Sequence, residues 1–153
     1  MATTTAAITL TSSDLLTDSL SLSASMTLYQ HGTTATGLDE VTYSRHNIPT
    51  GTNFDLIPES AALSEDASYV YISNKSTDAT YYVIISINSE VIGRLYAGDW
   101  LFMPWDADLT DTESATDPTG NDSSIECQAV TGENIIEYAL FHNGETLLTA
   151  GDS

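Results

Sequence analysis

Short runs of apolar residues alternate with polar turns along the second half of the chain, and each run has the length of a β-strand. Gly, Asn, Asp and Ser occupy the connections between the runs, and these residues are typical of tight turns. No segment has a sustained helical period. The pattern predicts an all-β protein, an antiparallel β-sandwich of the jelly-roll kind. The predicted strands of this half are 68–73, 81–87, 91–96, 100–105, 124–130, 135–141 and 146–150.

The beginning of the chain has a different composition. Residues 1–36 are dominated by Thr, Ser, Ala and Leu, and "TDSLSLSASMTLYQ" alternates apolar with small polar residues, which is the period of a half-buried strand. We therefore expect an extended N-terminal arm over 1–36 and one folded sandwich unit over 37–153, with a strand at 41–49 and a long connection at 49–68. Such an arm could complete the sheet of a neighbouring subunit by backbone hydrogen bonds. The same pattern also fits the first strands of a single domain.

The stretch "EVIGRLYAGDWLFMPWD" concentrates large side chains around a Gly-Asp turn. Its consecutive apolar residues fall on both faces of the predicted strands, so we expect one face to pack on the partner sheet and the other on another subunit. The candidate core or interface residues are Arg94, Tyr96, Trp100, Phe102 and Trp105. The simplest role for Arg94 is an ion pair with a carboxylate at a sheet or subunit boundary.

Acidic residues greatly outnumber basic ones, with 22 Asp and Glu against three Lys and Arg and a formal net charge of −19. Arg45, Lys75 and Arg94 could not neutralise a row of phosphates, which argues against nucleic acid as a partner. No apolar run reaches the length of a membrane span, and we expect neither a signal peptide nor a membrane. We therefore expect the protein to be synthesised in the cytoplasm. Cys127 is the single cysteine, so no intrachain disulfide can form.

One acidic segment is a weak candidate for a cation site. Asp106, Asp108 and Asp111 lie in it, followed by Glu113 and Asp117. An EF-hand loop starting at the first of these needs glycine at its sixth position and glutamate at its twelfth, where this chain has aspartate. The ordinary interpretation is a solvated acidic loop on the outside of the molecule.

No pattern points to catalysis or to a cofactor. His31, His46 and His142 are dispersed, with no second histidine at metal-ligand spacing. The Gly-x-Ser-x-Gly turn of serine hydrolases does not occur. The segment "GDWLFMP" resembles the Gly-Asp-x-x-x-x-Pro strand entry of cupins, but the histidine cluster that binds the cupin metal is missing, so this resemblance implies a jelly-roll strand only. We expect a protein that is not an enzyme and needs no metal or cofactor.

A second resemblance covers residues 33–144. In strand order and in short sequence segments, the chain resembles small β-sandwich structural proteins of tailed bacteriophages, particularly aquatic and cyanobacterial phages. The segments are "TTATGLDEVTYSRHNIP", "YVYISNKSTDATYYVIISI", "VIGRLYAGDWLFMPW" and "IIEYALF". The resemblance implies a virion component made in the host cytoplasm, most simply a capsid decoration or cement protein. Its partners would be the major capsid protein and other copies of itself, with a homotrimer preferred.

Two other functions stay open at this point. The same family resemblance fits a tail or head-to-tail accessory protein. A carbohydrate-binding, lectin-like sandwich is an alternative of another class, in which Trp100 or Trp105 would stack on a sugar ring. Exposure of the two indole rings separates this alternative from a core or interface role.

Overall fold

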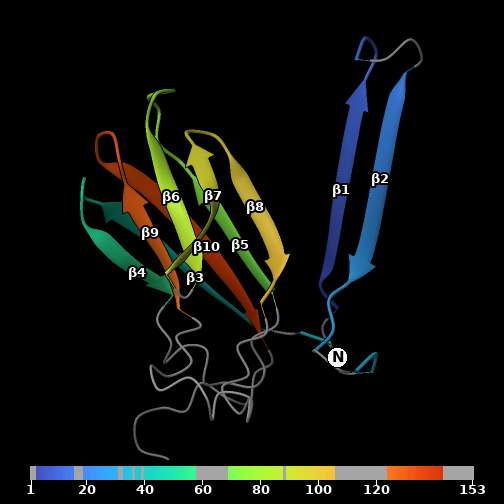
Figure 1. Cartoon of the computed structure of the whole chain (residues 1–153). Coiled ribbons are helices and arrows are strands. Elements are labelled where there is room, and N and C mark those ends of the chain that lie inside the picture. The colour runs from blue at the N-terminus through green and yellow to red at the C-terminus, as the bar shows by residue number, and fades with distance from the viewer. Residues whose placement is uncertain are drawn as a thin grey trace, which may run out of the picture.

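The computed structural model describes residues 3–15, 19–30, 33–35, 37–38, 40–57, 69–87, 89–105 and 124–142. These residues form ten β-strands and contain no helix (Figure 1). The strands are β1 (Thr5–Ser12), β2 (Leu20–Thr27), β3 (Glu40–Ile48), β4 (Asn53–Ile57), β5 (Tyr69–Asn74), β6 (Tyr82–Ile87), β7 (Glu90–Tyr96), β8 (Trp100–Pro104), β9 (Ile125–Ala129) and β10 (Asn134–His142).

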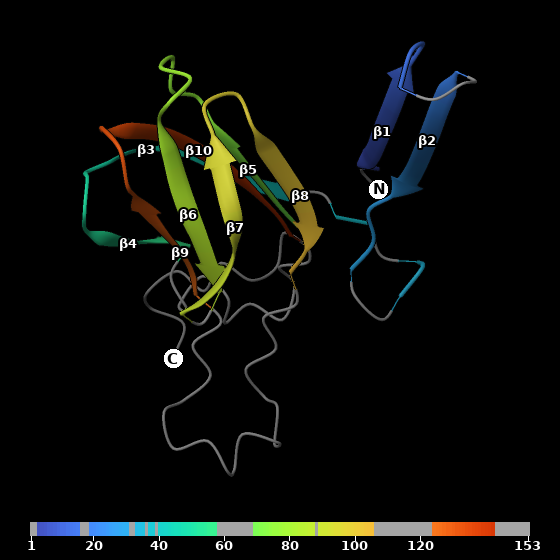
Figure 2. The same cartoon turned by 45° about the horizontal axis from the view of Figure 1, so that its top comes forward.

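Eight of the strands build two four-stranded sheets that pack face to face (Figures 1 and 2). One sheet has the order β3-β10-β5-β8, the other has the order β4-β9-β6-β7, and all neighbouring strands are antiparallel. The prediction of an all-β antiparallel sandwich is therefore confirmed. The predicted strands over 68–141 all occur, with bounds shifted by one or two residues, whereas 146–150 lies outside the described residues.

The core lies between the sheets and is filled by the inward side of each strand. Val70 and Ile72 of β5 face Val83 and Ile85 of β6, and all four side chains are fully buried. Alternate residues of a strand point to opposite faces, so the intervening residues face outward. The remaining buried members of this cluster are Ile48, Leu56, Ile57, Leu95, Trp105, Ile125, Cys127, Ala129, Ile136 and Leu140.

Strand β4 corrects one prediction. Residues 49–68 were expected to form a connection, but Asn53–Ile57 within it pairs with β9 and places Leu56 and Ile57 in the core. The segment is only five residues long and is followed by a proline, so its strand pattern is too short to recognise from sequence. Pairing with β9 supplies the backbone partners that make the short strand stable.

Two buried asparagines hold one end of the sandwich together. The Asn74 amide nitrogen donates to the carbonyl oxygen of Leu95 on the opposite sheet and to Oδ1 of Asn134, both at 3.0 Å. Its Oδ1 accepts the backbone N–H of Ser76 at 3.0 Å. Asn134 in turn donates to the carbonyl oxygens of Thr131 and Gly132, at 3.1 and 3.2 Å. Because both amides are fully buried, these bonds replace the hydration they lose.

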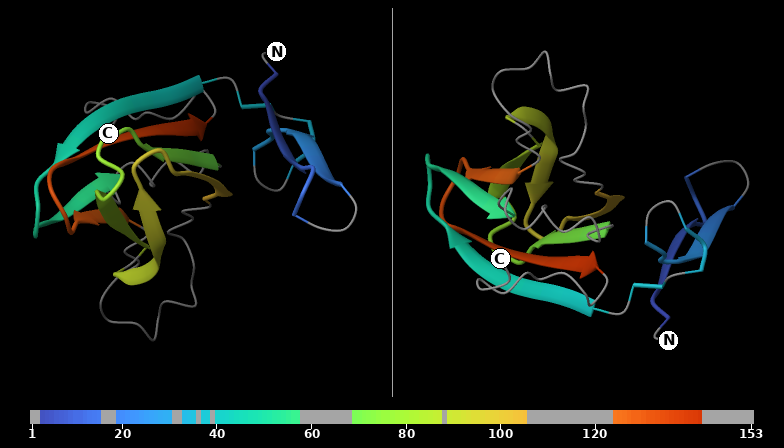
Figure 3. Two further views of the ribbon diagram at one scale, coloured as in Figure 1. Left: turned by 90° about the horizontal axis from the view of Figure 1, so that it is seen from above. Right: turned by 90° about the horizontal axis from the view of Figure 1, so that it is seen from below.

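The first two strands form a β-hairpin that is a sheet of its own. It stands beside the sandwich, next to β8, rather than between the two sheets (Figures 1 and 3). Its base is attached through Leu28 and Leu38, which are buried against Tyr69. Thr4 strengthens this attachment by hydrogen bonding through its hydroxyl to the carbonyl oxygen of Leu38 at 3.0 Å.

We expect Asn74→Ala to lower the free energy of unfolding by about 2–4 kcal/mol, because it leaves the Leu95 carbonyl and the Asn134 amide buried with a partner missing. Urea unfolding followed by far-UV circular dichroism measures the change. Asn53→Ala, at an exposed position of β4, is the matched control and should change stability by less than about 0.5 kcal/mol. Equal losses for the two variants would contradict the role given to the buried amides.

Candidate interaction surface

The outer side of the β3-β10-β5-β8 sheet carries aromatic side chains where a solvated sheet would carry polar ones. The register sets Tyr71 opposite Phe102 and Phe141 opposite Tyr69. The rings contact one another across the strands: Tyr69 and Phe102 stack with 5.6 Å between ring centroids, and Phe102 meets Phe141 edge-on at 6.4 Å. Trp100 extends the row, 6.2 Å from Tyr71. We call this surface, formed by Tyr69, Tyr71, Trp100, Phe102 and Phe141, the aromatic face.

The hairpin β1–β2 has one apolar and one polar side. Cross-strand partners lie on the same side of a sheet, and the partners on one side are all apolar for most of the hairpin. We call that side, made of Ala6, Ile8, Leu10, Leu22, Ala24 and Met26, the apolar hairpin face. The opposite side pairs Thr5 with Thr27, Thr9 with Ser23 and Thr11 with Ser21. The sequence thus encodes a hairpin with a side suited to burial.

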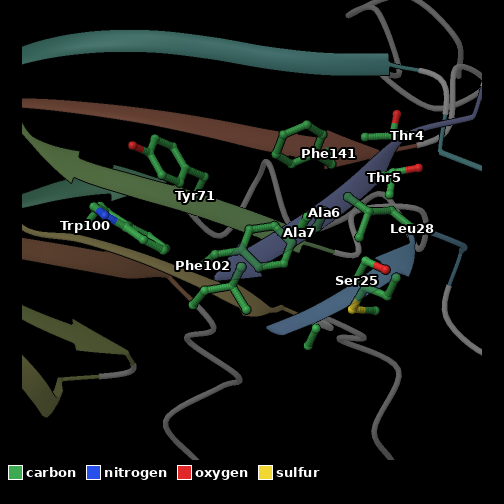
Figure 4. Close-up of a pocket in the computed structure, with 13 residues that line it drawn as sticks. Thr4, Thr5, Ala6, Ala7, Ser25, Leu28, Tyr71, Trp100, Phe102 and Phe141 are labelled. Atoms are coloured by element: carbon green, nitrogen blue, oxygen red, sulfur yellow. The ribbon is translucent and has the colours of Figure 1, made fainter. Parts of the chain in front are cut away.

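A groove of about 520 Å³ separates the hairpin from the sandwich. Figure 4 shows Tyr71, Phe102 and Phe141 reaching it from the sandwich and Ala6 and Leu28 reaching it from the N-terminal segment. The lining consists of Thr4, Thr5, Ala6, Ala7, Ile8, Ala24, Ser25, Met26, Leu28, Tyr71, Trp100, Phe102 and Phe141. Since none of these residues is charged, the groove suits an apolar occupant.

The structure separates the candidates of the segment 90–106. Trp100 is 50% exposed and Phe102 half-buried on the aromatic face, whereas Trp105 is only 4% exposed and belongs to the core between the sheets. Tyr96 and Arg94 lie exposed on the outer side of the other sheet, at strand β7. These five residues therefore divide among the core and two different surfaces.

Arg94 contacts an aromatic ring. Its guanidinium carbon lies 5.1 Å from the centroid of the Tyr82 ring, which is a cation–π geometry, and Tyr82 also packs on Tyr96 at 4.9 Å. The expected ion pair of Arg94 with a carboxylate remains a prediction. An ion pair that the structure does show joins Arg45 of β3 to Glu137 of β10, two residues that are directly opposite in the register.

A small polar cluster surrounds that ion pair. Hydrogen bonds from Tyr43 and Arg45 hold the pKa of Glu137 below its usual range, with the tyrosine hydroxyl making the larger contribution. The same contacts raise the pKa of Tyr43 and of Arg45. Glu137 is thus kept ionised in a nearly buried position on an otherwise weakly polar sheet. The cluster has the character of a structural charge pair rather than of an acid–base site.

The cysteine and histidine side chains that the structure describes make contacts within the fold. Burial raises the pKa of Cys127 to about 12, so its thiol stays protonated at neutral pH. His142 is buried with Nε2 2.9 Å from the Thr42 hydroxyl, and His46 Nε2 lies 2.9 Å from the hydroxyl of Ser44. Among the described residues, no three His, Cys, Asp or Glu side chains gather as metal ligands.

One sequence prediction, the cation site, falls on residues that the structure does not describe. The proposed cation-binding residues Asp106, Asp108 and Asp111, together with His31, lie outside the described residues. Within the part of the chain that the structure describes, no helix is long and apolar enough to cross a membrane.

The apolar hairpin face, and the part that Tyr71 and Phe141 play in the aromatic face, were not predicted from the sequence. The alternation in "TAAITLTS" and "LSLSASMT" was a usable signal for the hairpin, because pairing two such strands puts their apolar residues on one side. Tyr71 and Phe141 carried no comparable signal. Each lies in a run in which inward and outward residues are both apolar, so only the strand pairing tells the two faces apart.

Comparison with known proteins assigns no family to this chain. No protein-family model matches it, and neither a curated protein nor a solved structure matches it. The resemblance to phage virion proteins therefore stays a prediction from the sequence.

We expect Tyr43→Phe to raise the pKa of Glu137 toward that of an ordinary glutamate, because the hydrogen bond that contributes most to the lowering is removed. A pH titration of the Glu137 carboxyl carbon by NMR measures this directly. A carboxyl whose pKa is lowered by folding adds stability above its unfolded pKa and loses that contribution as the pH falls through its folded pKa. The variant should therefore be less stable than the wild type at neutral pH and equal to it in strong acid.

Tyr96→Phe is the control, since this tyrosine lies exposed on the opposite sheet. It should leave the titration of Glu137 unchanged. An unchanged pKa of Glu137 in Tyr43→Phe would show that Tyr43 does not bind the carboxylate.

Proposed function

We propose that this protein is a non-enzymatic structural component of a tailed-phage virion, a capsid decoration or cement protein that binds the shell of major capsid protein and assembles with itself, preferably as a trimer. The virion assignment comes from the resemblance of "VIGRLYAGDWLFMPW" and "IIEYALF" to such proteins. The assembly role comes from the surfaces described above. The two parts have separate support and can be tested separately.

The strand pairing favours a jelly roll. In the sandwich the strands pair from the ends of the chain inward: β3 with β10, β4 with β9, β5 with β8 and β6 with β7. A long antiparallel hairpin rolled into two sheets has this pairing, and double-sheet jelly rolls are frequent in viral capsid proteins and in lectins. The fold is compatible with the proposed function but also with the lectin alternative, because one architecture supports many functions.

The observation that carries the proposal is a second apolar surface outside the core. Trp100, Tyr71 and Phe102 lie on the outer side of a sheet whose inner side already packs against the other sheet. The N-terminal segment covers part of this surface at Tyr69 and Phe102, but Trp100 stays 50% exposed. Exposed apolar patches mark interaction sites. Aromatic residues are also the side chains most enriched at the energetic centres of protein interfaces.

Quantitative mass spectrometry of purified particles, from the phage whose genome encodes this chain, tests the virion assignment. We expect a copy number of the same order as that of the major capsid protein. A much lower copy number would move the protein to the tail or the head-to-tail connection, which is the alternative within the same class. Absence from the particles would overturn the virion assignment.

A lectin-like function is the second candidate, because exposed Trp100 and half-buried Tyr71 form an aromatic pair of the kind that stacks on sugar rings. Trp105 cannot serve as such a platform while it is buried in the core. If the aromatic face binds protein, we expect no saturable change in tryptophan emission on titration with a panel of oligosaccharides. A saturable shift that disappears in Trp100→Phe would instead establish the lectin function.

A further inference from the structure

The apolar hairpin face is largely uncovered within its own chain. Ile8, Leu10, Leu22 and Met26 are 42–55% exposed, whereas the base of the hairpin is attached to the sandwich at Leu28. A two-stranded hairpin is at best marginally stable in water unless one face is packed. The hairpin therefore needs a cover that the rest of this chain does not provide among the described residues.

Charge restricts what that cover can be. Neither β1 nor β2 contains a charged residue, and the groove beside them is lined without charge. With a net charge of −19, two copies of the chain repel each other wherever their acidic surfaces meet. At the hairpin and the groove, two copies can approach each other without burying like charges against one another. A basic partner would find no carboxylate on these surfaces to pair with.

The surface area available for contact determines where the second copy must bind. Eight residues per strand and two strands give the hairpin a face about 27 Å long and about 10 Å wide. That footprint is small against the roughly 800 Å² per partner of a standard stable interface. The aromatic face provides the missing area, because Tyr71, Trp100 and Phe102 form the second wall of the same groove. A second copy whose apolar hairpin face lies across both walls, in a reciprocal exchange, buries more area than two hairpins meeting alone and leaves the polar side of its hairpin in water.

We propose that the apolar hairpin face of a second copy of this chain covers the groove between the hairpin and the aromatic face. Each copy then donates its β1–β2 hairpin and receives another, either as a pair or around a closed ring. The inference names the self-contact within the proposed assembly role and does not depend on the virion assignment.

Sedimentation equilibrium of the purified full-length protein tests the contact, with the double variant Leu10→Thr/Leu22→Thr as the probe. The two leucines are directly opposite each other and half exposed in the single chain, so threonine should leave the sandwich folded. Burial of two leucine side chains on association predicts that the variant self-associates at least about 100-fold more weakly than the wild type.

The matched control is Thr9→Ala/Ser23→Ala, a facing pair on the polar side of the same hairpin. It should associate as the wild type does. A wild-type protein that stays monomeric throughout, as it would if the face served a different protein or a lipid, overturns the proposal. Self-association that Leu10→Thr/Leu22→Thr leaves unchanged overturns it equally, because the contact would then lie elsewhere.

Thiol protection gives a second readout that does not depend on the strength of association. Leu22→Cys and Ser23→Cys place a thiol on the apolar and the polar side of β2, and the native Cys127 does not compete because it is buried and its pKa is raised. At concentrations where the protein associates, Leu22→Cys should react with a disulfide reagent much more slowly than Ser23→Cys. On dilution the two rates should converge; equal rates in the assembled protein would refute the proposal.

These results are distinguishable from a failure of the proposed function. Self-association is measured on the isolated protein, whereas the virion assignment is measured on particles. If the protein is monomeric but abundant on particles, the hairpin exchange is wrong and the virion assignment stands. If it self-associates through the hairpin but is absent from particles, the virion assignment is wrong and the hairpin exchange stands.

Discussion

Apolar side chains from two four-stranded sheets share one buried layer, and the other features of this protein depend on that packing. Because the inward side of each strand is fixed by burial, the outward side is fixed as well. Val70 and Ile72 enter the core, so Tyr69 and Tyr71 of the same strand must face outward. The aromatic face is thus a consequence of the core register together with a strand that is apolar at nearly every position.

Two asparagine amides inside this layer are paired by hydrogen bonds. Asn74 bridges the sheets through the Leu95 carbonyl and binds Asn134, so that the loops at one end are tied to buried amides. On the outer side of the sheet, Glu137 is held ionised by Tyr43 and Arg45. Both clusters stabilise the sandwich, the first inside the core and the second at an outer surface where Tyr43 and Arg45 are exposed.

The uncharged surfaces matter for association because the chain as a whole is strongly acidic. With 22 acidic and three basic residues, copies of the chain carry a large charge of the same sign and repel one another. The chain nevertheless keeps two neighbouring surfaces that carry no charged side chain, the apolar hairpin face and the lining of the groove beside it. This distribution favours association through those surfaces, and salt should favour it further by screening the remaining charge.

The sequence by itself determined the class of fold and most of the strands, because strand length, turn residues and alternation are local properties. It could not place β4, which is short and depends on pairing with β9. Nor could it separate Trp100 from Trp105: both belong to one apolar run, but the first faces outward on β8 and the second follows the strand into the core. Which residues form the aromatic face and the groove was decided only by the tertiary structure, because that surface joins residues from β1, β2, β5, β8 and β10, and only long-range strand pairing brings those residues together.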